Sequence, residues 1–368
     1  MIGILIFILV LGVLVFVHEL GHFFVARQSG IAVEEFGFGF PPRIVGIKRG
    51  NTVFSLNWIP FGGFVRMQGE QEDAAARPDS FVSAHWSKQV AVLLAGVTMN
   101  FLFAWLVLTV TFVTGVSADP DQYPQDRYQQ RSAITIQAVV SENFPAAQSG
   151  LPSGAEIVSI NGVSYTSTEK LIEAVQKTKY PKLTIVARSQ GAEKTYVVEP
   201  KKSDTKDEAP RYGLGLQPVT TIRYPGWVAP WYGLRSTVSM LGQTFAGLGT
   251  MVNGLFHGKV SQDLTGPIGI AVLTNEVRQF GVVSLLQFMA FLSISLAALN
   301  ILPLPALDGG RTVFVLWSAI TKRPVSQKAE AIIHAVGFYG LLLMVVLISI
   351  RDVRRFNIVE SVLQLFGR

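Results

Sequence analysis

The chain has 368 residues, of which 49% are hydrophobic and only 15% are charged, and its formal net charge is +6. The length allows two or more domains, and the composition is typical of a membrane protein rather than a soluble one. The positive charge does not indicate nucleic-acid binding, because no basic stripe with interleaved aromatic residues is present. The absence of cysteine excludes disulfides and cysteine catalysis.

Four segments approach or reach the length of about 20 apolar residues that crosses a bilayer. They are residues 1–26, 89–118, 279–320 (uncharged from Gln279 to Leu307) and 331–350. The first has no basic leader or cleavage signal, so we expect a retained helix rather than a removed signal peptide. The sequence therefore predicts a multi-span α-helical membrane protein with about four transmembrane helices.

Lysine and arginine are concentrated in the 27–88 and 321–330 connections. The positive-inside rule places both connections on the cytoplasmic side, which puts the N-terminus and the long 119–278 region outside. We interpret this as multi-pass topology in a bacterial inner membrane. The basic 351–368 tail conflicts with the positive-inside rule, because four spans would place it outside. Its apolar spacing predicts an amphipathic helix on the membrane surface.

The 27–88 connection contains an apolar, glycine-rich stretch at about 33–68. Residues 53–58 and 64–67 read as two short strands joined by a turn at Pro60 to Gly63. A re-entrant β-hairpin associated with the membrane is compatible with this pattern, and so is an ordinary interfacial loop.

The outer 130–220 region predicts a small α+β domain. Strand patterns occur at 134–140, 154–162, 182–188, 194–199 and 212–216, and a helical pattern occurs at 167–178. The run A-A-Q-S-G-L…G-A-x-I-x-x-I-N-G resembles a PDZ domain of the bacterial, circularly permuted type. That resemblance implies a groove for an extended peptide, added as a strand, bordered by Gly213, Leu214, Gly215 and Leu216. A spacer domain without a ligand is the alternative.

Residues 226–278 connect this domain to the third predicted span. The part from 233 to 256 is amphipathic, and we expect it to lie against the membrane surface. An additional, poorer span is the alternative, but several glycines and Asn253 make it a weak one.

The motif His18-Glu19-Leu20-Gly21-His22 lies within the first apolar segment. Residues four apart share one face of a helix, so His18 and His22 can bind one metal ion together. Glu19 lies beside them and is the candidate general base. Ionisable residues inside a membrane-spanning helix are costly and indicate a functional site.

A catalytic zinc site usually has a third protein ligand. His18 lies roughly 25 Å along its helix, towards the inner side of the membrane. The third span should run in the same direction, and Asp308 stands at its inner end behind a proline-containing run. We therefore predict Asp308 as the third ligand. A helix-end cap is the alternative role for Asp308, and His334 and His257 are alternative ligands.

H-E-L-G-H in the first span and N-x-x-P-x-P-x-L-D-G in the third resemble the site-2 protease family of intramembrane zinc metalloproteases. The stretches E-F-G-F-G-F-P-P, I-P-F-G-G-F-V-R-M and L-T-G-P-I-G-I, with one PDZ-like domain, are similar to the bacterial regulator of sigma-E protease branch. The resemblance covers almost the whole chain. One departure is that the best-known members of the branch carry two tandem PDZ domains, whereas this chain has room for one.

The resemblance implies Zn²⁺ as the cofactor, His18, His22 and Asp308 as its ligands, and Glu19 as the general base. It implies that Asn300 contacts the substrate backbone or the oxyanion. It also implies that the hairpin holds an unwound substrate as an added strand, through residues that include Phe54, Leu56, Trp58, Phe64 and Met67.

The sequence thus predicts an intramembrane zinc metalloprotease that cleaves within or near transmembrane segments. The expected partners are the lipid bilayer, a peptide or protein terminus at the PDZ groove, and single-span substrates already trimmed outside, such as anti-sigma factors or remnant signal peptides. A non-catalytic membrane adaptor is the alternative, but it gives no reason for Glu19, His22 and Asp308 at matching depth. A transporter would usually need more polar residues and internal repeats.

Overall fold

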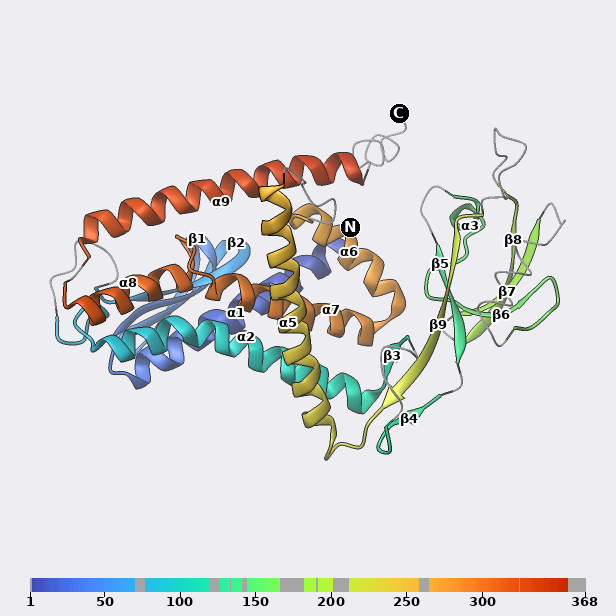
Figure 1. The fold of residues 1–368 in the computed structure, drawn as a ribbon, viewed down its shortest axis with the longest axis horizontal. Helices are drawn as coiled ribbons and strands as arrows, with labels where there is room; N and C mark the ends of the chain where they lie inside the picture. The colour runs from blue at the N-terminus through green and yellow to red at the C-terminus, as the bar shows by residue number, and fades with distance from the viewer. Residues whose placement is uncertain are drawn as a thin grey trace. The chain divides into compact units, whose positions relative to one another are not determined.

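The structure is a computed structural model with two compact units. It describes residues 2–69, 77–119, 126–132, 134–140, 144–165, 182–189, 191–200, 212–257, 265–323 and 325–356. Unit 1 comprises Met1–Leu108, Gly233–Asn275 and Phe288–Arg368, and unit 2 comprises Thr109–Tyr232 and Glu276–Gln287. Figure 1 labels their helices and strands.

Four helices in the described residues are long and apolar enough to cross a membrane. They are α1 (Ile2–Gln28), α2 (Trp86–Thr114), α7 (Val282–Ile301) and α9 (Gln327–Arg355). Each overlaps one predicted span, which confirms a helical membrane protein with an additional β domain. Residues 351–355 of the predicted tail belong to α9, and residues 357–368 lie outside the described residues.

The third predicted segment, 279–320, differs from the expected continuous span. It holds a short 3-10 helix η1 (Arg278–Phe280), then α7, and then a separate helix α8 (Asp308–Thr321). The break falls at Pro303 and Pro305, which lack the N–H groups that would continue α7. Asp308 therefore begins a new helix instead of ending the third span.

Two further helices, α5 (Ala229–Phe256) and α6 (Pro267–Val277), precede α7. The predicted amphipathic segment 233–256 lies within α5, which is not among the four candidate spans. The buried carboxylate of Asp352 joins α6 to α9. Its Oδ2 accepts hydrogen bonds from the backbone N–H groups of Gly266 (2.9 Å) and Gly269 (2.8 Å), at the start of α6.

The close contact between α1 and α2 depends on small residues. A Cβ added at Gly21 would clash with the backbone oxygen of Ala95 and lie 2.7 Å from Met99 Cγ. Small residues allow membrane helices to approach closely and to pack by van der Waals contact. Gly21 therefore sets the distance between the helix that carries the histidine motif and its neighbour.

The segments predicted as strands, 53–58 and 64–67, are both strand and the chain reverses between them, but they do not pair with each other as the predicted hairpin. Residues 53–56 and 63–66 instead flank residues 35–38 and run in opposite directions. Strand β2 (Thr52–Met67) pairs with β1 (Val33–Arg49), and the turn lies at Gly50-Asn51. The glycines and prolines of 37–42 favoured a loop in the sequence. They instead allow the strands to bend, as the register shifts around Phe38–Val45 show.

The bent strands pair in three runs. Residues 53–56 pair with 45–48 and also with 35–38, and residues 35–38 pair in turn with 63–66. Within the described part of the chain, the edge segments of this sheet are therefore 45–48 and 63–66. Phe36 and Phe54 pack on Phe23 of α1, with ring centroids 5.1 and 5.7 Å from its ring, so the sheet lies alongside the motif helix (Figure 1).

Glu35 joins separate parts of this sheet. It is buried and forms ion pairs with Arg43 (2.6 Å) and Arg66 (3.4 Å), one on each strand. Burial alone would raise the pKa of Glu35, but the hydrogen bond from Ser55 and the two arginines hold the pKa below its ordinary value. The carboxylate thus stays charged and ties edge segment 63–66 to the sheet.

Unit 2 is built on a seven-stranded sheet in the order β3-β9-β5-β6-β7-β8, with β4 paired to β9. Its elements are β3 (Val116–Ala118), β4 (Gln130–Arg131), β5 (Thr135–Val140), α3 (Pro145–Gln148), β6 (Glu156–Ile160), β7 (Leu183–Ser189), β8 (Ala192–Val198) and β9 (Leu214–Arg223). The strands predicted from 134 to 199 are confirmed to within two residues at each end. The predicted helix 167–178 lies outside the described residues, and the PDZ assignment stays a prediction.

We expect Gly21→Ala to destabilise the protein. Gly247→Ala, on α5, should leave its stability unchanged. The first Cβ would collide with the backbone of α2, whereas the second has no atom within 4 Å. Overpacking typically costs about 1–3 kcal/mol. Thermal unfolding in detergent should show a lower Tm for Gly21→Ala alone. Equal Tm values for the two variants would contradict the close α1–α2 contact.

Candidate metal centre

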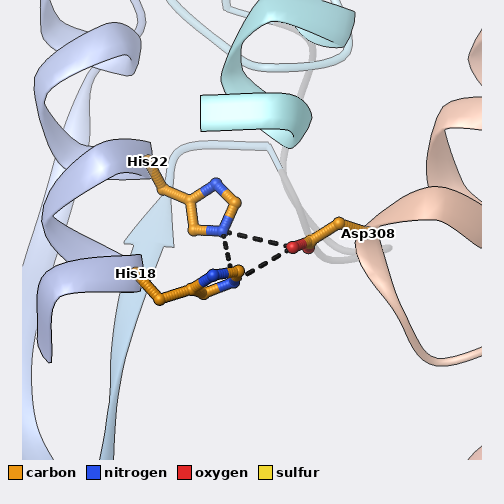
Figure 2. A group of neighbouring side chains, drawn as sticks. All are labelled: His18, His22 and Asp308. Carbon is orange, nitrogen blue, oxygen red and sulfur yellow. Dashed lines mark hydrogen bonds and ion pairs between the residues drawn. The ribbon is translucent and has the colours of Figure 1, made fainter. Parts of the chain in front are cut away.

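Helix α1 presents two histidines on one face, one turn apart. His18 and His22 are both buried, and their Nε2 atoms lie 3.1 Å apart. The rings meet edge to face, with centroids 4.7 Å apart. The i, i+4 spacing expected from the sequence thus brings two imidazole nitrogens to one point (Figure 2).

Asp308, the first residue of α8, reaches the same point from the other side. Its Oδ2 lies 3.1 Å from His18 Nε2 and 3.5 Å from His22 Nε2. Figure 2 shows the carboxylate directed at both rings. This group is the only cluster of three potential metal-ligating side chains among the described residues.

The turn before α8 fixes where Asp308 lies. Added Cβ atoms at Gly309 and Gly310 would clash with the backbone oxygens of Leu302 and Leu304, so only glycine lets the turn fold this tightly. Ala306 has a φ of 71°, and its N–H donates to His334 Nδ1 at 2.8 Å. His334 therefore supports the turn from α9 and does not belong to the cluster.

The three atoms suit a zinc ion. His22 Nδ1 lies 2.8 Å from the backbone oxygen of Val92, so this nitrogen carries the proton and Nε2 offers a lone pair. Three buried acceptors that face one another repel unless a cation lies between them. Their separations of 3.1–3.5 Å match the roughly 3.3 Å between ligands of a tetrahedral zinc with bonds of about 2.0–2.1 Å.

Helix α2 closes one side of the cluster through residues that the sequence analysis missed. A Cβ at Gly96 would lie 2.5 Å from His18 Cε1 and 2.6 Å from His22 Nε2. One turn further along, the fully buried amide of Asn100 lies 3.3 Å from His18 Nδ1. The signal that could have revealed Asn100 is a carboxamide within an apolar span.

Two further predicted residues lie near the cluster. The half-buried Glu19 interacts electrostatically with His22, and its Cγ would lie 3.5 Å from a Cβ built on Gly63. Glu19 is therefore next to edge segment 63–66. Asn300, near the end of α7, has its Nδ2 3.5 Å from His18 Nε2. The alternative ligand His257 is exposed and contacts Asn253.

A large cavity adjoins edge segment 63–66. Its volume is about 1270 Å³, and it is lined by Phe64, Val65 and Arg66 of the edge and by residues of α8 and α9. Ala306, two residues before Asp308, also lines it. The cavity therefore runs between the sheet edge and the turn that carries a candidate ligand.

The predicted hairpin residues fall into different environments. Phe64 lines the cavity, and Leu56 and Trp58 are exposed. Phe54 packs against Phe23 and Phe36, and Met67 is buried in the same core, so the side chains of Phe54 and Met67 serve the fold.

The predicted peptide groove maps to the start of β9 in unit 2. Leu214, Gly215 and Leu216 pair with residues 138–140 of β5, and in the described part of the chain their other edge has no partner strand. Gly213 has a φ of 69°, and a Cβ there would clash with Phe144. Among the described residues, this edge is therefore open to strand addition.

Comparison with known proteins identifies relatives along almost the full chain. The model of peptidase family M50 matches residues 6–344. Proteins named "Putative zinc metalloprotease" are similar in Clostridium acetobutylicum (29% identity, 95% of this chain and 97% of the relative), Clostridium perfringens (31%, 94% and 97%) and Agrobacterium fabrum (31%, 94% and 94%).

We expect Asp308→Ala to weaken zinc binding by more than the roughly 10–100-fold that is typical of losing an outer-shell partner. The variant loses the only carboxylate of the cluster. Competition with a chromogenic chelator measures the affinity, and His257→Ala, at an exposed site, is the control. Unchanged affinity in Asp308→Ala would remove Asp308 from the ligand set.

Proposed function

Because this chain belongs to peptidase family M50, the site-2 protease family, and is a zinc metalloprotease of that type, we propose that it hydrolyses peptide bonds within or near transmembrane segments. The observation that carries the proposal is the convergence of His18, His22 and Asp308. The two histidines lie on an apolar helix that can cross a membrane.

His18, His22 and Asp308 would hold the zinc ion. A zinc ion bound there supplies a Lewis acid, which polarises a carbonyl and lowers the pKa of water. The carboxylate of Glu19 takes a proton from the attacking water and passes it to the leaving amine. The amide N–H of Asn300 donates to the oxyanion that develops on the scissile carbonyl.

Edge segment 63–66 is the proposed site for the substrate backbone. A helical substrate hides its backbone groups in its own hydrogen bonds, so it must unwind before cleavage. A free strand edge offers replacement hydrogen bonds. Support comes from the position of Glu19, whose Cγ would lie 3.5 Å from a Cβ added at Gly63, and from the cavity of about 1270 Å³ that the edge lines.

The finer assignment follows the resemblance to the regulator of sigma-E protease branch. On this proposal, the chain lies in a bacterial inner membrane, with the N-terminus and a single PDZ domain outside and the active site towards the cytoplasm. Its substrates are pre-trimmed single-span proteins, such as anti-sigma factors or remnant signal peptides. The edge at 214–216, which has no second partner strand among the described residues, supports a groove that captures a peptide or protein terminus.

Glu19→Gln tests the proposed reaction. Glutamine is close in shape to glutamate but cannot accept the proton, so cleavage of a single-span model substrate should fall at least about 100-fold. Zinc content should stay at the wild-type level, because Glu19 is not in the ligand cluster. Full cleavage by Glu19→Gln would contradict the assigned base. No cleavage by the zinc-loaded wild type would favour the membrane adaptor.

Cysteine cross-linking tests the proposed substrate edge. The chain has no cysteine of its own, so a single introduced cysteine is unique. In a Glu19→Gln background, Phe64→Cys should form a disulfide with a cysteine near the cleavage site of the substrate. Ile47→Cys, exposed on the opposite edge segment 45–48, should not. Equal cross-linking at both positions would argue against the 63–66 edge.

A further inference from the structure

Three residues of α2 face the two histidines at regular spacing. Val92, Gly96 and Asn100 are each four positions apart and therefore lie on one face of the helix. Val92 contacts His22, Gly96 lies against both rings, and Asn100 contacts His18. Each ring of the cluster thus meets one polar group of α2.

The contact to His22 shows what such a polar group does. The Val92 carbonyl accepts from Nδ1 at 2.8 Å, which leaves Nε2 unprotonated and directed at the cluster. His18 must also keep Nε2 unprotonated, because its Nε2 is the atom that faces His22 and Asp308. A neutral imidazole that offers Nε2 must carry its proton on Nδ1, and that N–H needs an acceptor.

Asn100 is the polar side chain at that nitrogen. Its Nδ2 lies 3.3 Å from His18 Nδ1, and its buried Oδ1 has no hydrogen-bond partner among the described residues. A ring N–H facing an amide N–H would oppose two donors. A half-turn of the carboxamide exchanges two atoms of similar size and places the unpaired Oδ1 at the ring N–H.

The backbone of Asn100 is held independently of its side chain. Ser293 of α7 donates its hydroxyl to the Asn100 backbone oxygen at 2.9 Å, and both residues are fully buried. A substitution of the Asn100 side chain therefore leaves this contact between α2 and α7 in place. The amide itself is directed at His18.

We infer that Asn100 is a positioning residue for zinc: its Oδ1 accepts the Nδ1 proton of His18 and holds the Nε2 lone pair towards the metal. The inference rests on the proposed zinc site. Outer-shell hydrogen bonds of this kind fix the tautomer and the orientation of a metal-bound histidine, and their loss typically lowers metal affinity about 10–100-fold.

The test compares zinc affinity in variants that keep or remove the acceptor. Asn100→Asp keeps an oxygen acceptor, and Asn100→Leu has a similar volume without one. Thr111→Val, at another buried polar position on α2, is the matched control. Purified proteins are titrated with zinc against a chromogenic chelator. The increase in Tm on adding zinc is a second readout, because it depends on affinity for the folded protein.

Asn100→Leu should bind zinc about 10–100-fold more weakly and show a smaller zinc-dependent increase in Tm. Asn100→Asp and Thr111→Val should stay within a few-fold of the wild type. Wild-type affinity in Asn100→Leu, or equal losses in the aspartate and leucine variants, would overturn the inference while leaving the zinc site intact. No zinc binding by the wild-type protein would overturn both.

Discussion

The architecture of the site depends on the close approach of backbones around three buried atoms that could bind a metal ion. His18 and His22 lie on an apolar helix, where polar groups are tolerated only when they pair with each other or bind a partner. Glycine residues allow the two histidine rings and Asp308 to come together. Gly21 brings α2 against α1, Gly96 leaves room for both rings, and Gly309 with Gly310 folds the turn that directs Asp308 at them. A side chain at any of these positions would occupy space that the cluster or its supporting backbone fills.

Around this cluster, each element of unit 1 supplies or supports a different group. Helix α1 supplies two candidate ligands and Glu19, α2 supports the rings, and α8 supplies the carboxylate. The bent β1–β2 sheet brings edge segment 63–66 next to Glu19 and lines the cavity. Helix α9 supports the Asp308 turn through His334 and joins α6 through Asp352. On the proposed function, the sheet edge and the cavity would give an unwound substrate both hydrogen-bonding partners and space beside Glu19.

The sequence predicted those features that follow from short-range periodicity or from composition. The spacing of His18 and His22 requires a shared helix face, and the structure places Asp308 beside them, although Asp308 begins α8 instead of ending a span. Strand β1 was missed because Gly37, Gly39 and two prolines are typical of a loop. Residues 53–58 and 64–67 were therefore predicted to pair with each other, whereas both segments of β2 pair with β1. Gly96 and Asn100 were missed because their roles depend on how α2 is rotated against α1, which a single segment does not encode.

The central claim is that the zinc-loaded protein cleaves peptide bonds within an apolar span, and mass spectrometry of the products tests it most directly. The protein and a single-span substrate are reconstituted in lipid vesicles, with and without a chelator. The account predicts new termini inside the apolar segment of the substrate, lost on chelation and restored by added zinc. An intact substrate, or cleavage confined to the segments outside the membrane and indifferent to the chelator, would contradict it.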